Sequence, residues 1–317
     1  MCYSGAVAKF QATRLAAFLL IISFAISGIN SPVVRYGLAT IPTPLFGFLR
    51  MIIPLLILTP FFMLTKHKPL KIRQIALAML FGFTIYFAAN GLFYLGVQRS
   101  GAVNAAIIGL LEPLFLFTFS VEVMREKFNG RILAGIAIAL GGSLLIVFGP
   151  MIALQDLSFS GSLTGNLLLV GCSLCSVFGV WIAKIALKQL DRIQLLFWSL
   201  VSGTTLYGLL SFGQWGQIPG IFQNPGTASA VLFGAIFNGL FTYLFAFYAV
   251  KRLKGEEYGI FEYVNPAVAA VVAVIFFGEK FTPILLLGVA IIFTGLYLAE
   301  AHRGKKAQLH HHLLRGR

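Results

Sequence analysis

Charged residues are scarce in this chain of 317 residues, and apolar residues dominate it. Only 11% of the residues are Asp, Glu, Lys or Arg, whereas 58% are hydrophobic. A soluble domain needs more polar side chains than this to cover its surface. The apolar runs are long and do not alternate with polar residues, which excludes a membrane β-barrel and favours membrane-spanning helices.

Residues that commonly carry enzyme chemistry are missing from the apolar runs. None of these runs holds Asp or His, and the chain has no Gly-x-Ser-x-Gly, His-Glu-x-x-His or Walker-type phosphate-binding sequence. Its three cysteines, Cys2, Cys172 and Cys175, give no disulfide framework, and the last two have no partner histidine for a metal. We therefore expect no enzyme, no cofactor, no metal site and no ATP hydrolysis by this chain.

Ten apolar segments are long enough to cross a bilayer, which takes about 20 helical residues. They cover approximately residues 15–36, 43–64, 74–96, 102–124, 131–149, 164–187, 193–212, 227–250, 257–277 and 283–301. The first segment is predicted to be a retained helix, because no small-residue cleavage site follows it. The predicted division is a cytoplasmic tail (1–14), a first five-helix unit (15–149), an extracytoplasmic connecting loop (150–163), a second five-helix unit (164–301) and a basic cytoplasmic tail (302–317).

The distribution of basic residues indicates an orientation in the membrane. The net charge of +14 does not indicate a nucleic-acid partner, because the basic residues lie in short loops between apolar segments. With the N-terminus in the cytoplasm, twenty of the 24 Lys and Arg residues fall on the cytoplasmic side, as the positive-inside rule requires. We therefore predict an integral protein of a bacterial inner (plasma) membrane with both termini in the cytoplasm.

The sequence also repeats itself at a fixed interval. Residues 112–147 align with residues 265–300 without a gap, and Glu126-Lys127-Phe128 returns as Glu279-Lys280-Phe281. Because each unit has an odd number of helices, the second unit enters the membrane upside down. The predicted fold is an all-α integral membrane protein with ten transmembrane helices in two inverted-topology five-helix repeats, the arrangement of carriers that expose one central site alternately to each side.

Several short motifs occur in a specific order along the chain. They are Gly28-Ile29-Asn30-Ser31-Pro32, Phe48-Leu49-Arg50, Leu111-Glu112-Pro113 and Tyr263-Val264-Asn265-Pro266. With the repeated Glu-Lys-Phe, they make the chain resemble the EamA-like ten-helix branch of the drug/metabolite transporter superfamily. One departure is Ser27, where the family usually has Trp. The resemblance implies export or exchange of metabolites, amino acids or drugs through a cavity lined by helices 1, 3, 4, 6, 8 and 9, with helices 5 and 10 at the periphery.

Two ionisable side chains lie deep within predicted spans, where a charge is costly and points to function. Arg50 and Glu112 lie about 10 Å and 15 Å below the same face, at 1.5 Å per helical residue. One hypothesis is that Arg50 holds a substrate carboxylate or that Glu112 carries a proton. The other is a fixed Arg50–Glu112 salt bridge that locks the packing. Glu112 corresponds to Asn265 in the second repeat, so the shared fold does not require an acid there.

Other polar residues recur at helical spacing. Tyr86, Asn90 and Tyr94, for example, lie four residues apart and therefore share one helix face. Singly, each polar residue fits an ordinary interhelical hydrogen bond, but the set as a whole favours a pore lining. The predicted substrate-binding residues are Ser27, Asn30, Arg50, Tyr86, Asn90, Tyr94, Glu112, Ser176, Asn238, Thr242, Glu262 and Asn265.

Proline and glycine add predictions about flexibility and packing. Pro113 and Pro266 each remove a backbone hydrogen bond within a span, which makes them either a matched pair of hinges or static kinks. Glycines in the fifth and tenth spans are predicted to let helices approach closely, as small residues do in membranes. These glycines are Gly135, Gly141, Gly142, Gly288 and Gly295.

The sequence therefore predicts a secondary carrier that moves a small zwitterionic or amphipathic solute, such as an amino acid, outward by alternating access. The expected partners are the solute and the lipid bilayer, with the proton as a candidate coupling ion, and the chain is expected to be a monomer or a homodimer. The alternatives are a carrier that expels drugs or toxic compounds, a membrane-embedded enzyme and a non-transporting scaffold.

Overall fold

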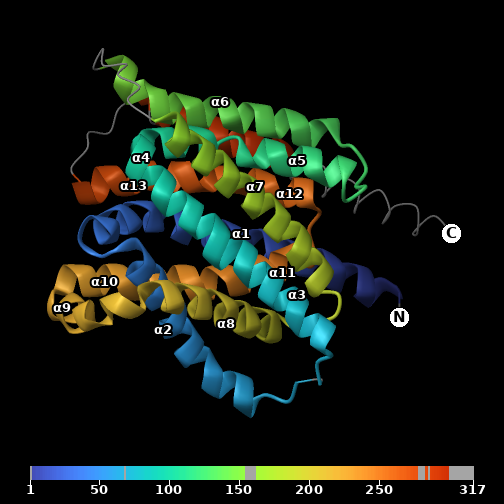
Figure 1. Cartoon of the computed structure of the whole chain (residues 1–317). Helices are drawn as coiled ribbons and strands as arrows, with labels where there is room; N and C mark the ends of the chain where they lie inside the picture. The colour runs from blue at the N-terminus through green and yellow to red at the C-terminus, as the bar shows by residue number, and fades with distance from the viewer. Residues whose placement is uncertain (1, 68, 154–161, 278–282, 285, 300–317) are drawn as a thin grey trace, which may run out of the picture.

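The computed structural model describes residues 2–67, 69–153, 162–277, 283–284 and 286–299, and these residues form helices joined by turns (Figure 1). The first half comprises α1 (Cys2–Thr40), α2 (Thr43–Leu64), α3 (Ile72–Gly82), the π-helical η1 (Phe83–Ala89), α4 (Asn90–Gly109), α5 (Glu112–Glu122) and α6 (Gly130–Ala153). The second half comprises α7 (Leu163–Ala186), α8 (Arg192–Ser211), the 3₁₀-helical η2 (Phe212–Gln217), α9 (Ile218–Gln223), α10 (Pro225–Phe233), the π-helical η3 (Gly234–Thr242), α11 (Tyr243–Val250), α12 (Gly255–Gly259), the 3₁₀-helical η4 (Ile260–Tyr263), α13 (Val264–Phe277) and the helix Leu286–Ala299.

Within the described residues, seven helical stretches are long and apolar enough to cross a membrane. They are Gln11–Thr40, Thr43–Leu64, Ile72–Ser100, Asn104–Glu122, Leu163–Ala186, Arg192–Gln223 and Pro225–Val250. Two shorter apolar helices, Gly130–Ile146 and Leu286–Ala299, and the path through α12, η4 and α13 fill the places of the other three predicted spans. Large apolar side chains such as Leu209 and Tyr297 are exposed on the outside of the bundle, where lipid would cover them.

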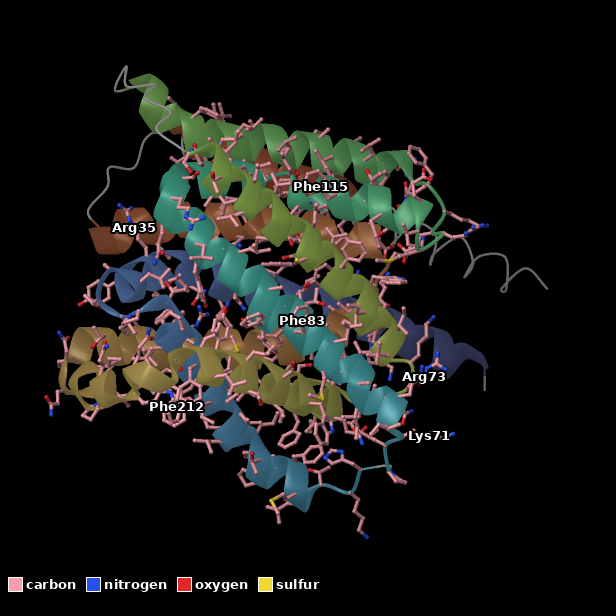
Figure 2. The ribbon with its side chains drawn as sticks, viewed as in Figure 1. Arg35, Lys71, Arg73, Phe83, Phe115 and Phe212 are labelled. Carbon is pink, nitrogen blue, oxygen red and sulfur yellow. The ribbon has the colours of Figure 1, made fainter. Side chains whose placement is uncertain are left out.

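Basic side chains lie at opposite ends of the bundle. Figure 2 shows Arg35 at one end and Lys71 and Arg73 at the other, and all three are exposed. An exposed charge near the end of an apolar helix can be solvated by water and headgroups, whereas the same charge midway along the helix cannot. The long axes of the helices therefore run between two polar ends, as expected for a bundle that spans a bilayer.

Two segments that the sequence predicts as loops are helical. Helix α4 continues through residues 97–101, which contain no proline to interrupt its hydrogen bonds. The predicted loop 213–226 holds η2, α9 and the start of α10, where the Asn224 side chain caps α10 by accepting hydrogen bonds from the Gly226 and Thr227 amides. Helix α6 extends into the predicted loop 150–163, whose residues 154–161, like the repeated Glu279-Lys280-Phe281, lie outside the described residues.

Close glycine contacts join α6 to the helix Leu286–Ala299. A Cβ atom on Gly142 would lie 2.7 Å from the Gly288 carbonyl oxygen, and one on Gly135 would lie 2.8 Å from that of Gly295. The lower-numbered glycine of one helix thus meets the higher-numbered glycine of the other, so the two helices run antiparallel. The predicted close packing is confirmed for these four glycines. It is wrong for Gly141, around which no atom lies within 4 Å of an added Cβ, because one step along a helix turns a residue by about 100°.

Two further contacts join equivalent positions of the two halves. The Tyr86 hydroxyl donates a hydrogen bond to the Gly239 carbonyl (3.5 Å), and the Tyr263 hydroxyl donates one to the Leu110 carbonyl (3.1 Å). Both pairs are separated by 153 residues, which is the interval that aligns Glu112 with Asn265. Direct contact between equivalent residues, together with reciprocal glycine contacts, is the pattern of an interface around an approximate two-fold axis.

Candidate functional site

A cavity of about 1400 Å³ lies inside the bundle. Its walls come from α1, from the continuous path α3–η1–α4, from α5 and α7, and from the two paths α10–η3–α11 and α12–η4–α13. Among the described residues, α2, α6, α8 and the helix Leu286–Ala299 contribute none of its lining. The predicted set of lining helices (1, 3, 4, 6, 8 and 9) and the peripheral place of helices 5 and 10 are therefore confirmed.

The two ends of the cavity differ in exposure. At one end Arg35, Tyr36 and Ser229 are exposed, and the Tyr36 side chain is 49% accessible. At the other end the lining residues Ala183, Val250 and Tyr258 are buried. The cavity is thus open at the end marked by Tyr36 and closed at the end marked by Val250.

A set of tight contacts closes the cavity at the Val250 end. Glu126, in the turn after α5, accepts hydrogen bonds from the Lys184 ammonium on α7 (2.5 Å) and from the backbone amide of Gly255 at the start of α12 (2.8 Å). The side chains of Glu126 and Lys184 are only 16% and 15% exposed, so water screens their attraction weakly. Glu126 therefore ties the first half of the chain to two helices of the second half.

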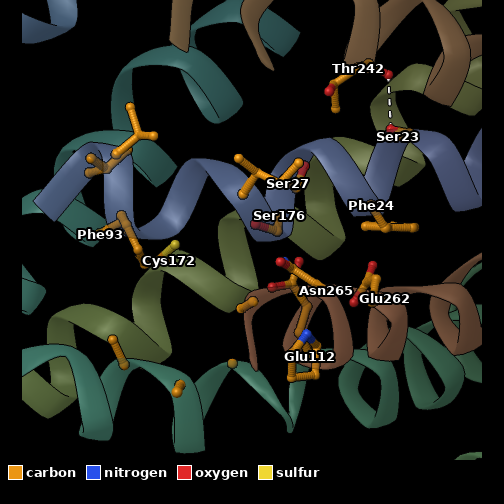
Figure 3. Close-up of a pocket in the computed structure, with 18 of the residues that line it drawn as sticks. Ser23, Phe24, Ser27, Phe93, Glu112, Cys172, Ser176, Thr242, Glu262 and Asn265 are labelled. Atoms are coloured by element: carbon orange, nitrogen blue, oxygen red, sulfur yellow. Dashed lines mark hydrogen bonds between the residues drawn. The ribbon is translucent and has the colours of Figure 1, made fainter. Parts of the chain in front are cut away.

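The middle of the cavity carries two carboxyl groups. Figure 3 shows Glu112, Glu262, Asn265 and Ser176 close together, with Ser27 facing them from α1. The Ser176 side chain lies beside Glu112, and Glu112 and Glu262 are close enough for their charges to act on each other. Two carboxylates in a largely apolar wall repel each other when both are ionised. This part of the cavity therefore favours a positively charged group between them.

Arg50 lies outside this cavity lining and is 3% exposed. Its guanidinium donates hydrogen bonds to the Tyr94 hydroxyl (2.7 Å), to the side-chain oxygens of Asn238 (2.8 Å) and Asn30 (3.2 Å), and to the Gly234 carbonyl (3.5 Å). The fixed Arg50–Glu112 pair is not among the salt bridges of the described residues, so that hypothesis is wrong for this conformation. Similar depth did not bring the two together, because the donors of Arg50 face other helices.

The Arg50 network reaches the cavity wall through one further bond. The side-chain amide of Asn238 donates to the Ser27 hydroxyl at 3.3 Å, and Ser27 lines the cavity. Arg50 thus holds Asn238 from one side while Asn238 holds Ser27 on the other. This arrangement fixes the orientation of a polar group at the wall without placing the guanidinium in the cavity.

The structure separates the predicted site residues into two groups. Those that line the cavity are Ser27, Glu112, Ser176, Thr242, Glu262 and Asn265, together with Pro113 and Pro266. Those that lie behind the lining are Asn30, Arg50, Tyr86, Asn90, Tyr94 and Asn238. The second group bonds to backbone and to side chains of neighbouring helices, and its role in substrate binding stays a prediction.

Two π-helical segments occupy matching places in the two halves. Such wide turns leave backbone carbonyls without their usual helical partner and often occur at functional sites. In η1 the Asn90 side chain donates to the Ile85 and Tyr86 carbonyls, and in η3 the Gly234 and Gly239 carbonyls accept from Arg50 and Tyr86. Three of the residues behind the lining therefore stabilise irregular helix turns.

The two prolines stand in the first turns of helices and not within them. Pro113 is the second residue of α5, after a turn at residues 110–111, and Pro266 is the third residue of α13, after the 3₁₀ segment η4. Proline is tolerated there because its missing amide hydrogen would have no helical partner. The carbonyl of Leu110, freed by the first break, accepts the hydrogen bond from Tyr263. Whether the breaks bend during transport stays a prediction.

Sequence reasoning missed several residues of this region. The residues not singled out are Tyr36 and Ser229 at the open end, Tyr258 between the closed end and Glu262, and Glu126 with its closing contacts. Their contacts join helices far apart in the chain, and a single sequence gives no signal for such pairings. Within the described residues no group of three or more His, Cys, Asp or Glu side chains is arranged to hold a metal.

A helical membrane bundle that encloses a chamber with polar groups at its middle, between two duplicated halves, defines a solute carrier as the class of protein. A family model confirms this class at the level of sequence. The model of the EamA-like transporter family matches residues 14–148 and again residues 163–300. The chain belongs to the EamA-like transporter family, within the drug/metabolite transporter superfamily, and is an integral membrane protein of a transporter family and not of an enzyme family.

Individual relatives have low sequence identity to this chain but align with most of its length. The chain is 25% identical over 276 residues to an uncharacterized transporter of Archaeoglobus fulgidus, covering 84% of this chain and 91% of the relative. It is 29% identical over 253 residues to the threonine/homoserine exporter RhtA of Escherichia coli, covering 77% of each chain. A protein of known crystal structure shares the fold with a TM-score of 0.73 at 14% identity, covering 90% of this chain and 97% of the other.

Proposed function

We propose that the protein is a secondary transporter that exports amino acids or similar small amphipathic solutes by alternating access. The observation that carries the proposal is the central cavity, which is built by helices of both halves, open at one end and closed at the other. A chamber of this form, with polar groups at its middle, is what a carrier needs in order to hold a solute away from both sides. The exporter RhtA, named for threonine and homoserine, supports amino acids as the solute class.

Two observations support an inverted arrangement of repeats 15–149 and 164–301. The glycine contacts between α6 and the helix Leu286–Ala299 are reciprocal and antiparallel, so the approximate two-fold axis runs across the helices and within the plane of the membrane. The loops with most basic residues lie on the Val250 side of the cavity, which the positive-inside rule assigns to the cytoplasm of a bacterial inner membrane. In this orientation both termini are cytoplasmic, and the described conformation opens outward.

The experiment that tests this proposal is counterflow in proteoliposomes. Vesicles that contain the purified protein are loaded with unlabelled threonine or homoserine and then exposed to a trace of the labelled amino acid. A carrier accumulates label transiently without an energy source, because exchange through one site equalises specific activity on the two sides. Protein-free vesicles and the exposed-residue variant Glu122→Gln serve as controls. The absence of transient accumulation for every amino acid of a standard panel would contradict the proposal.

The alternative is export of larger amphipathic toxic compounds. It is favoured by the aromatic side chains that line the cavity, among them Phe24, Phe93 and Phe233, and by the volume of about 1400 Å³. Apolar walls with a few fixed polar groups are the usual form of a site for drug-sized ligands. Competition experiments decide between the two proposals. If the protein exports toxic compounds, a dye or a lipophilic drug should inhibit counterflow more strongly than any amino acid.

A further inference from the structure

The charge of the cavity lining is acidic at its middle and nearly free of bases. Glu112 and Glu262 both belong to the lining, whereas its basic residue among the described residues is Arg35, which lies at the exposed open end. Arg50 is turned away from the cavity and donates to four other groups. A negatively charged group at the middle would therefore meet two carboxyl groups and no cation.

We infer that Glu112 and Glu262 bind the ammonium group of the transported solute. The inference rests on the proposed function, because it names the end of the solute that this cavity recognises. It reverses the expectation that Arg50 selects a carboxylate. It identifies the substrates as primary amines, amino acids included, and excludes organic acids that lack an amino group.

The polar groups around the pair match the donors of a primary ammonium, which has three N–H bonds and no acceptor. Glu112 and Glu262 offer carboxylate oxygens, and the Asn265 side-chain oxygen lies beside them (Figure 3). The Ser176 side chain lies beside Glu112 in the same wall. A charged hydrogen bond to each carboxylate would also remove the repulsion between them, which no neutral ligand can do.

An aromatic wall adjoins the acidic pair. The rings of Phe24 and Tyr258 meet edge to face, with 5.5 Å between their centroids, and both line the cavity. Tyr258 lies close enough to Glu262 for the two to interact electrostatically. Aromatic faces attract cations that lie within about 6 Å, so the wall favours the same ligand charge as the carboxyl pair.

A second polar group, independent of the acidic pair, points to a ligand. The hydroxyl of Thr242 is buried without a hydrogen-bond partner in a side chain that is 8% exposed, and Thr242 lines the same cavity. Its own carbonyl is occupied by the Ser23 hydroxyl at 3.0 Å. A buried hydroxyl without a partner is costly. A solute with a second polar group, such as a hydroxyl or a carboxylate, would satisfy Thr242 while its ammonium lies between the two carboxyl groups.

Matched ligands test the inference without any change to the protein. Threonine is compared with isopropanolamine, which lacks its carboxylate, and with β-hydroxybutyrate, which lacks its amino group. Phenylalanine, phenethylamine and hydrocinnamate form a second set of larger size. A ligand that binds the folded state raises the melting temperature of the purified protein, and at equal concentration a tighter ligand raises it more. We expect the amino acids and the amines to raise it and both acids to leave it unchanged at equal concentration.

Variants of the two carboxyl residues test whether the amines bind at this pair. Glu112→Gln and Glu262→Gln should each weaken the apparent affinity for the amines by about tenfold or more, because a charged hydrogen bond is lost. Glu122→Gln is the matched control, since Glu122 ends the same helix α5 on an exposed surface outside the cavity lining, and its affinity should equal that of the parent.

The outcomes separate this inference from the proposed function. The inference is overturned if the acids stabilise the protein as strongly as the amines do. It is also overturned if neither amine stabilises the protein, even if threonine shows counterflow. Stabilisation by the amines that Glu112→Gln and Glu262→Gln both retain would also overturn it. Amine binding without counterflow would leave the ammonium site in place and remove the transport proposal.

Discussion

Arg50 shows how a buried charge can be held without an opposite charge. Its two terminal guanidinium nitrogens donate hydrogen bonds to Tyr94, Asn30, Asn238 and the Gly234 carbonyl, whereas its Nε is buried without a partner. The centroid of the Phe46 ring lies 5.3 Å from the central carbon of the guanidinium. The planar guanidinium presents five donors in fixed directions, which suits several acceptors on different helices at once. The sequence showed that Arg50 is costly in a span, but it could not show which helices supply the acceptors.

Replacement of Arg50 by lysine tests this role. The lysine ammonium cannot reach acceptors on three helices together, so Arg50→Lys should lower the stability of the folded protein by about 2–4 kcal/mol through unpaired buried groups. The melting temperature in detergent measures the effect, and Arg73→Lys, at an exposed position, is the control. If Arg50 selects a carboxylate instead, Arg50→Lys should keep the parent melting temperature and weaken stabilisation by hydrocinnamate or threonine.

The helices were largely predictable from the sequence, and their irregularities were not. Long apolar runs and the aligned segments around Pro113 and Pro266 gave the spans and the duplication. The π-helical turns η1 and η3 went unpredicted, because seven to nine residues are too few for hydrophobic periodicity to separate a wide turn from an ordinary one. The helical segments after α8 were missed because glycines and prolines at 213–226 indicated a loop.

Neighbouring glycines in α6 provide a matched test of helix packing. Gly142→Ala would place a methyl group 2.7 Å from the Gly288 carbonyl oxygen, whereas Gly141→Ala would place one in open space. We expect Gly142→Ala to destabilise the fold by about 1–3 kcal/mol through overpacking. Gly141→Ala should be neutral or stabilise by up to about 1 kcal/mol, because alanine favours the helix. Equal melting temperatures for the two variants would show that the helices separate at low cost.

In the molecule as a whole, two duplicated halves surround a cavity whose two ends differ, one being open and the other closed. Contacts between equivalent residues, such as Tyr86 with Gly239 and Leu110 with Tyr263, maintain the framework around the cavity. The sequence predicted this duplication and the lining helices, since both follow from the repeat and the family resemblance. It could not predict which end of the cavity is closed, because Glu126, Lys184 and Gly255 come together from distant parts of the chain.

Glu126 provides the test of that closed end. Glu126→Gln removes the attraction for Lys184 but keeps an oxygen that can accept from the Gly255 amide. In the proposed transport cycle these contacts must break for the cavity to open toward the cytoplasm, so a weaker pair raises the fraction of molecules open at that end. If the closed end loses about 1 kcal/mol of stabilisation, that fraction increases about fivefold.

The fraction of molecules that are open toward the cytoplasm can be followed by cysteine labelling. Cys2, Cys172 and Cys175 are replaced by serine, a cysteine is placed at Val250, and the rate of its labelling by a membrane-impermeant maleimide from the cytoplasmic side is measured. Lys184→Gln should have the same effect as Glu126→Gln, and the double variant should add little, because the two side chains form one pair. Lys188→Gln, at an exposed position just beyond α7, should label at the parent rate. Unchanged labelling in both Glu126→Gln and Lys184→Gln would mean that packing of the buried residues Ala183, Val250 and Tyr258 closes the cavity without help from the ion pair.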